Sequence, residues 1–110
     1  MSDIFYIKTH DTDPAMLYDL PSGVDLTGAT AVVFNMRLRN TVAPKIDRKA
    51  ASIVSAASPA TLRYDWADDG SDTDTSGDYE AEFEVTRADG STATFPTYGY
   101  IDVQIGGDIA

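Results

Sequence analysis

Alternation of apolar and polar residues with a period of two is the feature that most constrains the fold of this chain. In the stretch YEAEFEV, residues 79–85, Tyr79, Phe83 and Val85 fall on one side and three glutamates fall on the other. Successive side chains of a β-strand point to opposite faces of a sheet, so the pattern indicates strands with one buried and one solvated face. The same alternation returns in three further segments, residues 30–39, 61–66 and 100–105.

Turn-forming residues separate these segments and set the number of strands. Clusters of Gly, Pro, Asp and Ser occur at residues 21–23, 26–28, 58–60, 68–78 and 88–90. Weaker strand patterns lie at residues 4–9, 16–20 and 52–56; residues 46–57 also suit one helical turn, although strand is preferred. Seven or eight short strands at this spacing are typical of an antiparallel β-sandwich, and the length suits one domain over residues 1–110.

The Asp89-Gly90 pair marks a hairpin whose register is predictable. A two-residue loop would send Phe95 to the polar side of the hairpin. A three-residue loop over residues 88–90 instead places Phe83 opposite Phe95 and Val85 opposite Ala93, which keeps one face apolar throughout. We therefore expect the longer loop, with Gly90 in the left-handed conformation of a bulge.

Composition excludes several classes of function. The chain contains no cysteine, which removes disulfides, thiolate zinc sites and cysteine nucleophiles. The net charge of −10 argues against non-specific binding to nucleic acid and to anionic lipid, and it favours partners that offer positive charge. No apolar run approaches the length of a membrane span, and the first residues do not read as a secretion signal.

The candidates for catalysis are the glutamate row and the single histidine, and neither indicates a catalytic site. Glu80, Glu82 and Glu84 would stand roughly 6.5–7 Å apart along a strand, as any exposed alternating strand provides. A general acid also needs a raised pKa, hence burial or a close neighbour, and nothing in the sequence supplies a pocket. His10 lies in a polar turn. We expect a solvated sheet face and no enzyme.

Aspartates crowd the segment 68–78, where Asp68, Asp69, Asp72 and Asp74 are the candidate interaction residues. Oxygen-rich loops of this kind can hold calcium. The EF-hand spacing fails, because its third position counted from Asp68 is a glycine. An irregular calcium site at residues 68–78 stays open, beside the simpler reading of a polar loop. No other cofactor or metal is predicted.

Basic residues are concentrated in a different segment. Five of the eight lie between residues 37 and 49: Arg37, Arg39, Lys45, Arg48 and Lys49. If the basic segment and the aspartate-rich loop occupy opposite flanks, head-to-tail contacts between copies could close into rings. An aromatic group at Phe95, Tyr98 and Tyr100 offers a second surface, which suits a protein interface, sugar stacking or simple packing at the end of the sandwich.

Three segments in order resemble a known family. They are VDLTGATAVVFNMR at residues 24–37, LRYDW at 62–66 and GDYEAEFEVTRADGSTATFPTYGYIDVQI at 77–105. Together they are similar to the immunoglobulin-like N-terminal domain of bacteriophage baseplate upper proteins. The resemblance implies an immunoglobulin-like β-sandwich and a non-enzymatic role in the virion. A further similarity to immunoglobulin folds is that Tyr79 stands where a tyrosine corner would, with Ala81 at the usual cysteine position.

These observations predict a phage virion structural protein of the tail or baseplate region that binds itself and neighbouring virion proteins. The interface candidates are the five basic residues, the aspartates of residues 68–78 and the tip formed by Tyr98 and Tyr100. A capsid decoration protein on the phage head, bound to the major capsid protein, is the alternative within the same class. A carbohydrate-binding module built on Tyr98 and Tyr100 is the alternative from another class.

Overall fold

The computed structural model describes residues 4–107, which form nine β-strands and one short 3₁₀ helix at Ser71–Thr73. The strands are β1 (Ile4–Lys8), β2 (Met16–Asp19), β3 (Ala29–Leu38), β4 (Pro44–Ala50), β5 (Ser52–Ser55), β6 (Thr61–Tyr64), β7 (Gly77–Arg87), β8 (Thr92–Phe95) and β9 (Ile101–Gly106). The all-β prediction is confirmed, and residues 46–57 contain strand rather than a helical turn. Within residues 4–107, no helix has the length and apolar character that crossing a bilayer would require.

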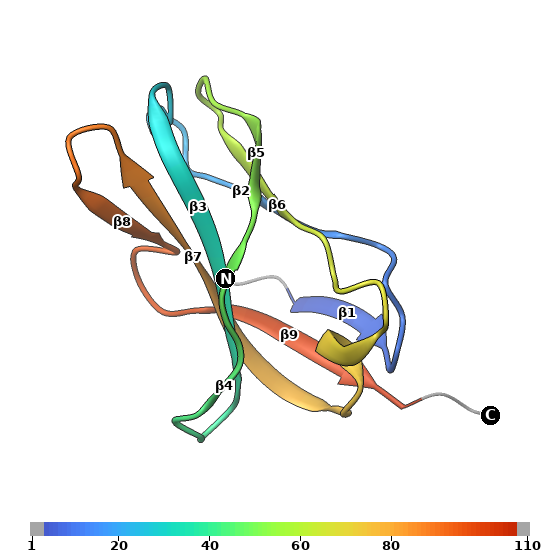
Figure 1. The fold of residues 1–110 in the computed structure, drawn as a ribbon. Coiled ribbons are helices and arrows are strands. Elements are labelled where there is room, and N and C mark those ends of the chain that lie inside the picture. Colours follow the sequence, from blue (N-terminus) through green and yellow to red (C-terminus); the bar gives the residue numbers. More distant parts are fainter. Residues whose placement is uncertain (1–3, 108–110) are drawn as a thin grey trace.

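The strands form two sheets, which pack as a small sandwich about 46 Å long and 26 Å across (Figure 1). The larger sheet has six strands, in the order β1-β9-β7-β3-β4, with β8 paired to β7. The smaller sheet has three strands, in the order β2-β6-β5. The long strand β7 is shared along its length: its first half pairs with β9 and its second half with β8.

Two features of the sheets differ from the sequence prediction. Strands β1 and β9 run parallel, with Phe5 opposite Val103, whereas every other pairing among the described strands is antiparallel. Nine strands form where seven or eight were expected, because the strand region over residues 46–57 divides into β5 and the separate strand β4. The residues of β4 alternate poorly, since Asp47, Arg48 and Lys49 are all exposed and register shifts interrupt its pairing with β3.

The hairpin of β7 and β8 has the predicted register. Phe83 lies opposite Phe95, Glu84 opposite Thr94 and Val85 opposite Ala93. Gly90 has a φ of 88°, a left-handed conformation that glycine adopts without steric penalty. The three-residue loop is thus confirmed, and the buried side chains of the hairpin all face the core.

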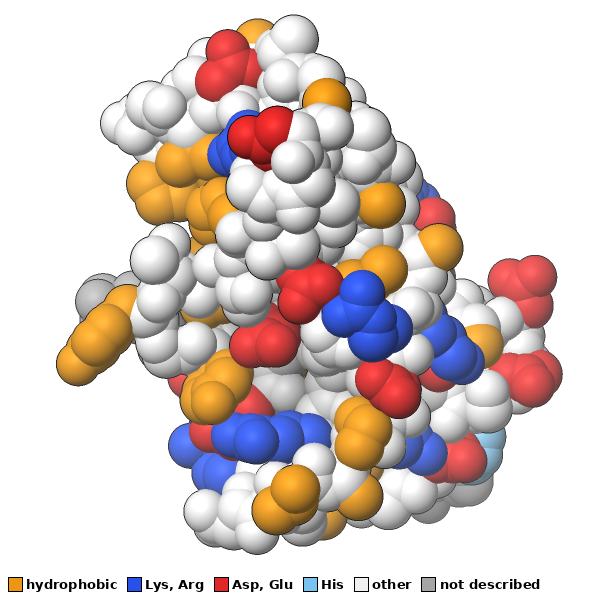
Figure 2. Space-filling model, turned by 60° about the vertical axis from the view of Figure 1, so that its left-hand side comes forward, with side chains coloured by type: hydrophobic (Ala, Val, Ile, Leu, Met, Phe, Trp, Pro, Cys, Tyr) orange, Lys and Arg blue, Asp and Glu red, His pale blue; other side chains and the backbone are white. Residues whose placement is uncertain are grey.

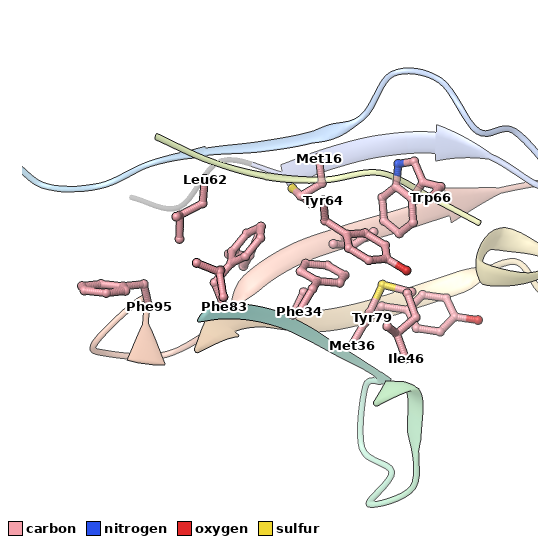
Figure 3. Packing of buried hydrophobic residues seen from close by; sticks show 14 of the residues in the cluster. Met16, Phe34, Met36, Ile46, Leu62, Tyr64, Trp66, Tyr79, Phe83 and Phe95 are labelled. Atoms are coloured by element: carbon pink, nitrogen blue, oxygen red, sulfur yellow. The ribbon is translucent and has the colours of Figure 1, made fainter. Parts of the chain in front are cut away.

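Aromatic rings from both sheets meet at the centre of the core (Figure 3). Phe34 of β3 stacks on Tyr64 of β6 with ring centroids 4.4 Å apart, and it also contacts Phe83 and Trp66. Burying one large apolar side chain stabilises a fold by roughly 1.5–3 kcal/mol, and aromatic pairs add about 0.5–1.5 kcal/mol. This cluster therefore holds the two sheets together.

A tyrosine at the start of β7 fixes the entry of the chain into that strand. The Tyr79 hydroxyl donates a 2.8 Å hydrogen bond to the backbone carbonyl of Thr75, while its ring is buried. Burial raises the pKa of the Tyr79 phenol above its usual value. A tyrosine that bonds back to the backbone a few residues upstream is the geometry of a tyrosine corner.

Replacing Tyr79 with phenylalanine keeps the buried ring and removes only this hydrogen bond. We expect the free energy of unfolding to fall by about 1 kcal/mol, because the Thr75 carbonyl loses its partner. Urea denaturation of Tyr79→Phe against the parent chain measures the effect. Tyr98→Phe is the matched control, and it should stay within about 0.5 kcal/mol because that side chain is exposed. Equal stability of the two variants would show that the bond contributes nothing.

Candidate interaction surfaces

Ion pairs cover the outer face of the larger sheet. The register of β3 against β7 places Arg37 opposite Glu80, and Arg37 Nε lies 3.2 Å from Glu80 Oε1. Arg48 reaches Glu84 at 2.8 Å, and Arg39 reaches Asp102 at 2.8 Å. The glutamate row does form the outer face of a sheet, as predicted. Its three members are half-buried rather than fully solvated, and Glu80 and Glu84 pair with arginines.

A bulge in β4 supplies one of these pairs. Arg48 has a φ of 51°, which is unusual for a residue other than glycine, at the point where the pairing of β3 with β4 shifts register. Its backbone N–H donates to Asn35 Oδ1 at 2.7 Å, which stabilises the bulge from the neighbouring strand. The bulge directs the Arg48 guanidinium to Glu84 on β7, across the intervening strand β3.

The aspartate-rich loop folds back onto the basic strand of the same molecule. Lys45 Nζ pairs with Asp74 Oδ1, and Lys49 Nζ lies 3.4 Å from Asp72 Oδ1. Figure 2 accordingly shows lysine and arginine side chains beside aspartate and glutamate side chains, not in separate regions. The basic segment and the acidic loop therefore do not occupy opposite flanks. The condition on which charge-driven rings depended is not met.

Asp72 is an internal structural acid rather than a surface charge. The side chain is only 3% exposed, and its Oδ2 accepts hydrogen bonds from the Tyr64 hydroxyl at 2.6 Å and the Ala67 N–H at 2.8 Å. Burial, reinforced by the bond to Asp72, strongly raises the pKa of the Tyr64 phenol. These bonds anchor the loop to the core.

The other aspartates of the loop are engaged separately. Hydrogen bonding from the side chain of Ser71, and then from its backbone N–H at 2.9 Å, lowers the pKa of the Asp69 carboxyl. Asp74 pairs with Lys45, and Asp68 is exposed. Over residues 4–107, no three His, Cys, Asp or Glu side chains come together as a metal site would require. Among these residues, the calcium site that the sequence left open has no assembled ligand set. His10 lies in an exposed turn after β1.

The aromatic tip divides into two different environments. Tyr100 lies against Arg37, whose guanidinium is 5.0 Å from the ring centroid and donates to the Tyr100 hydroxyl at 3.1 Å. Tyr98 is 96% exposed. Phe95 is not part of the tip, because it is buried in the core opposite Phe83. An almost fully exposed tyrosine of this kind is available to a partner.

A groove of about 650 Å³ lies beside this tip, between strand β1 of the larger sheet and strand β2 of the smaller one. Its lining residues are Ile4, Phe5, Met16, Leu17, Tyr18, Asp19, Pro96, Tyr98, Tyr100 and Ile101. Ile4 and Leu17 are exposed although both are large and apolar. Period-two alternation does not predict this groove. The available signal is that residues 16–18 are all apolar, which breaks the alternation and forces one of them outward.

Comparisons with known proteins do not assign the chain: no family model matches it, and neither a curated protein nor a solved structure matches it significantly. The function is therefore inferred from the fold, from the exposed surfaces of the sandwich and from the resemblance in the sequence.

The Asp72 network gives a testable expectation for stability. An asparagine cannot satisfy Tyr64, Ala67 and Lys49 together, because its amide nitrogen is a donor and all three partners are donors. We expect Asp72→Asn to lower the free energy of unfolding by about 2 kcal/mol or more. The control Asp74→Asn removes an exposed ion pair and should leave the free energy of unfolding nearly unchanged. Chemical denaturation compares them, and equal losses would contradict the structural role of Asp72.

Buried tyrosines predict a loss of stability in alkaline solution. Burial raises the pKa of Tyr18, Tyr64 and Tyr79 in the folded chain. The folded state therefore holds these protons more tightly than the unfolded state, in which the tyrosines have a pKa of about 10. Stability is fully present below that pKa and falls as the pH rises above it. Urea denaturation from about pH 8 to about pH 11 measures the fall, and a level profile would contradict it.

Proposed function

We propose that this chain is a non-enzymatic structural module of a bacteriophage virion, in the tail or baseplate region, which binds copies of itself and neighbouring virion proteins. The observation that carries the proposal is the apolar groove between the two sheets. On a chain with a net charge of −10, it gathers four large exposed hydrophobic side chains from β1, β2 and the β8–β9 connection: Ile4, Leu17, Tyr98 and Tyr100. Exposed apolar surface of this kind marks an interaction site.

The residues that carry the phage resemblance have a consistent place in the structure. Leu26, Phe34, Trp66, Tyr79 and Phe83 are all buried in one core cluster. The pattern that this chain shares with the family is therefore explained by packing of the sandwich core, and it requires no catalytic site. They thus support kinship of fold with the baseplate domains, while the contacts with other proteins are made by different, exposed residues.

Strand order supports the immunoglobulin-like part of the proposal. Variable-type immunoglobulin sandwiches place strands B, E and D in one sheet and G, F, C and C′ in the other. The smaller sheet, β2-β6-β5, corresponds to B-E-D. The strands β9-β7-β3-β4 of the larger sheet correspond to G-F-C-C′. Tyr79 then opens strand F as a tyrosine corner, and Ala81 follows two residues later. The parallel strand β1 lies beside β9 at the edge of the larger sheet.

Among the interface candidates, the groove favours the tyrosine tip over the charged segments. Tyr98 and Tyr100 both line the groove. Arg37, Arg39, Lys45, Arg48 and Lys49 already have partners within the chain. Breaking such pairs to form new ones between molecules gains little, because exposed ion pairs contribute only about 0–1 kcal/mol each. We therefore propose an assembly contact dominated by apolar packing.

Immunogold electron microscopy of phage particles from the source culture tests the proposed location. Antibody raised against this chain should label the tail or its tip. Label spread over the head would favour the capsid decoration alternative. No label on any particle would contradict a virion role. In that case a glycan array, read with the parent chain and with Tyr98→Ala, would test the carbohydrate-binding alternative.

A further inference from the structure

Strand β2 is an edge strand whose outer side carries hydrogen-bonding groups of the backbone. It pairs with β6 on one side only, since it stands at the end of the three-stranded sheet. The Leu20 N–H donates to the Ala60 carbonyl, in continuation of the same register. Paired residues of an antiparallel ladder alternate between bonded and non-bonded, so Tyr18 and Met16 also turn their backbone groups to β6.

Leu17 and Asp19 consequently direct their backbone N–H and C=O groups away from β6. Within residues 4–107, no backbone or side-chain group bonds to the main chain of either residue from that side. Residues two apart on a strand are roughly 6.8 Å apart. The backbone N–H and C=O groups on one side of a second strand recur at the same spacing. The free side of β2 therefore has the geometry to receive one more strand.

Two other edge strands, β4 and β5, carry features that hinder such pairing, whereas β2 pairs in an uninterrupted register. Strand β4 begins at Pro44, carries Lys45, Arg48 and Lys49, and has two register shifts. Strand β5 also has a register shift. Prolines, charges and bulges are the usual means by which edge strands avoid unwanted pairing. The sequence MLYD of β2 has no proline, no basic residue and no register shift.

The groove lies alongside this unprotected edge. A strand added there would turn every second side chain toward Phe5, Tyr18 and Ile101, which line the groove between the two sheets. Among the described residues that line the groove, Asp19 is the only charged one, and the chain as a whole carries −10. An apolar segment with basic rather than acidic ends is therefore the complementary occupant, and a second copy of this chain is disfavoured by its own charge of −10.

We infer that β2 is a docking site for an extended segment of a different protein, which adds a fourth strand to the small sheet by main-chain hydrogen bonds to Leu17 and Asp19. The segment alternates apolar and polar side chains, with the apolar ones in the groove and a basic residue near Asp19. Strand addition of this kind takes its affinity from the backbone and its specificity from alternate side chains. The inference rests on the proposed function and deepens it: the β2 edge takes a neighbouring virion protein, and contacts between copies of this chain use other exposed surface.

A tethered strand tests the inference without any virion. A segment of about seven residues, alternating valine and threonine between two lysines, is fused to the N-terminus of the full chain. A Gly/Ser linker of about ten residues reaches roughly 17 Å and gives a millimolar effective concentration. The linker leads to the groove because Ile4 lines it. We expect the segment to slow hydrogen exchange at the Leu17 and Asp19 amides by at least about tenfold, with Met16 and Tyr18 already protected in the parent chain.

Two matched segments serve as controls. A proline in place of the central valine should abolish the protection, because proline cannot donate to the ladder. Glutamates in place of the terminal lysines should weaken it, because they face Asp19. Equal protection by the glutamate version would overturn the charge preference of the site.

Three results would overturn the inference itself. One is no protection from the lysine-ended segment. Another is full protection of the Leu17 and Asp19 amides in the dilute parent chain, which would mean that the edge is already covered. The third is protection that grows with the concentration of the parent chain alone, which would make a second copy the occupant. None of these bears on where the chain sits in a particle, so the immunogold result stands independently.

Discussion

The stack of Phe34 on Tyr64 is the contact on which the rest of the structure depends. It joins the two sheets face to face, with ring centroids 4.4 Å apart. Because Tyr64 is held there, its hydroxyl meets Asp72, and Asp72 in turn holds Ala67 and faces Lys49. A single aromatic contact thus positions the aspartate-rich loop against the basic strand. The charges of the surface are arranged by the core, and not the reverse.

That arrangement explains why the charged segments are weak candidates for assembly. Each of the five basic residues between residues 37 and 49 finds its carboxylate within the same molecule. Such pairs stiffen the outer face of the larger sheet and keep β4 and the loop in place. Their contribution to binding is small, because a partner would have to replace contacts already made. The surface left for recognition is therefore the apolar groove, which includes Leu17 and Tyr98.

Sequence patterns predicted what depends on local alternation and missed what depends on distant pairing. The faces of β7, and the opposition of Phe83 and Phe95, follow from period two and from a glycine turn. The parallel pairing of β1 with β9 joins residues almost a chain length apart, and alternation does not encode strand direction. The ion pair of Lys49 with Asp72 likewise needs the fold before the two residues are neighbours. Basic and acidic segments therefore looked like separate surfaces when they are one.

The unequal size of the two sheets connects the fold to the proposed mode of binding. The larger sheet has six strands and the smaller one three, and the groove beside β2 is the margin left open between them. Apolar side chains at this margin would contact water, which is unfavourable unless other groups or a partner cover them. A strand added at the margin would hydrogen-bond the backbone N–H and C=O groups of Leu17 and Asp19, and it would also cover the groove. A flat partner surface would cover the side chains and leave the backbone groups of β2 without ladder partners, which is why an extended segment fits this edge better than a globular face.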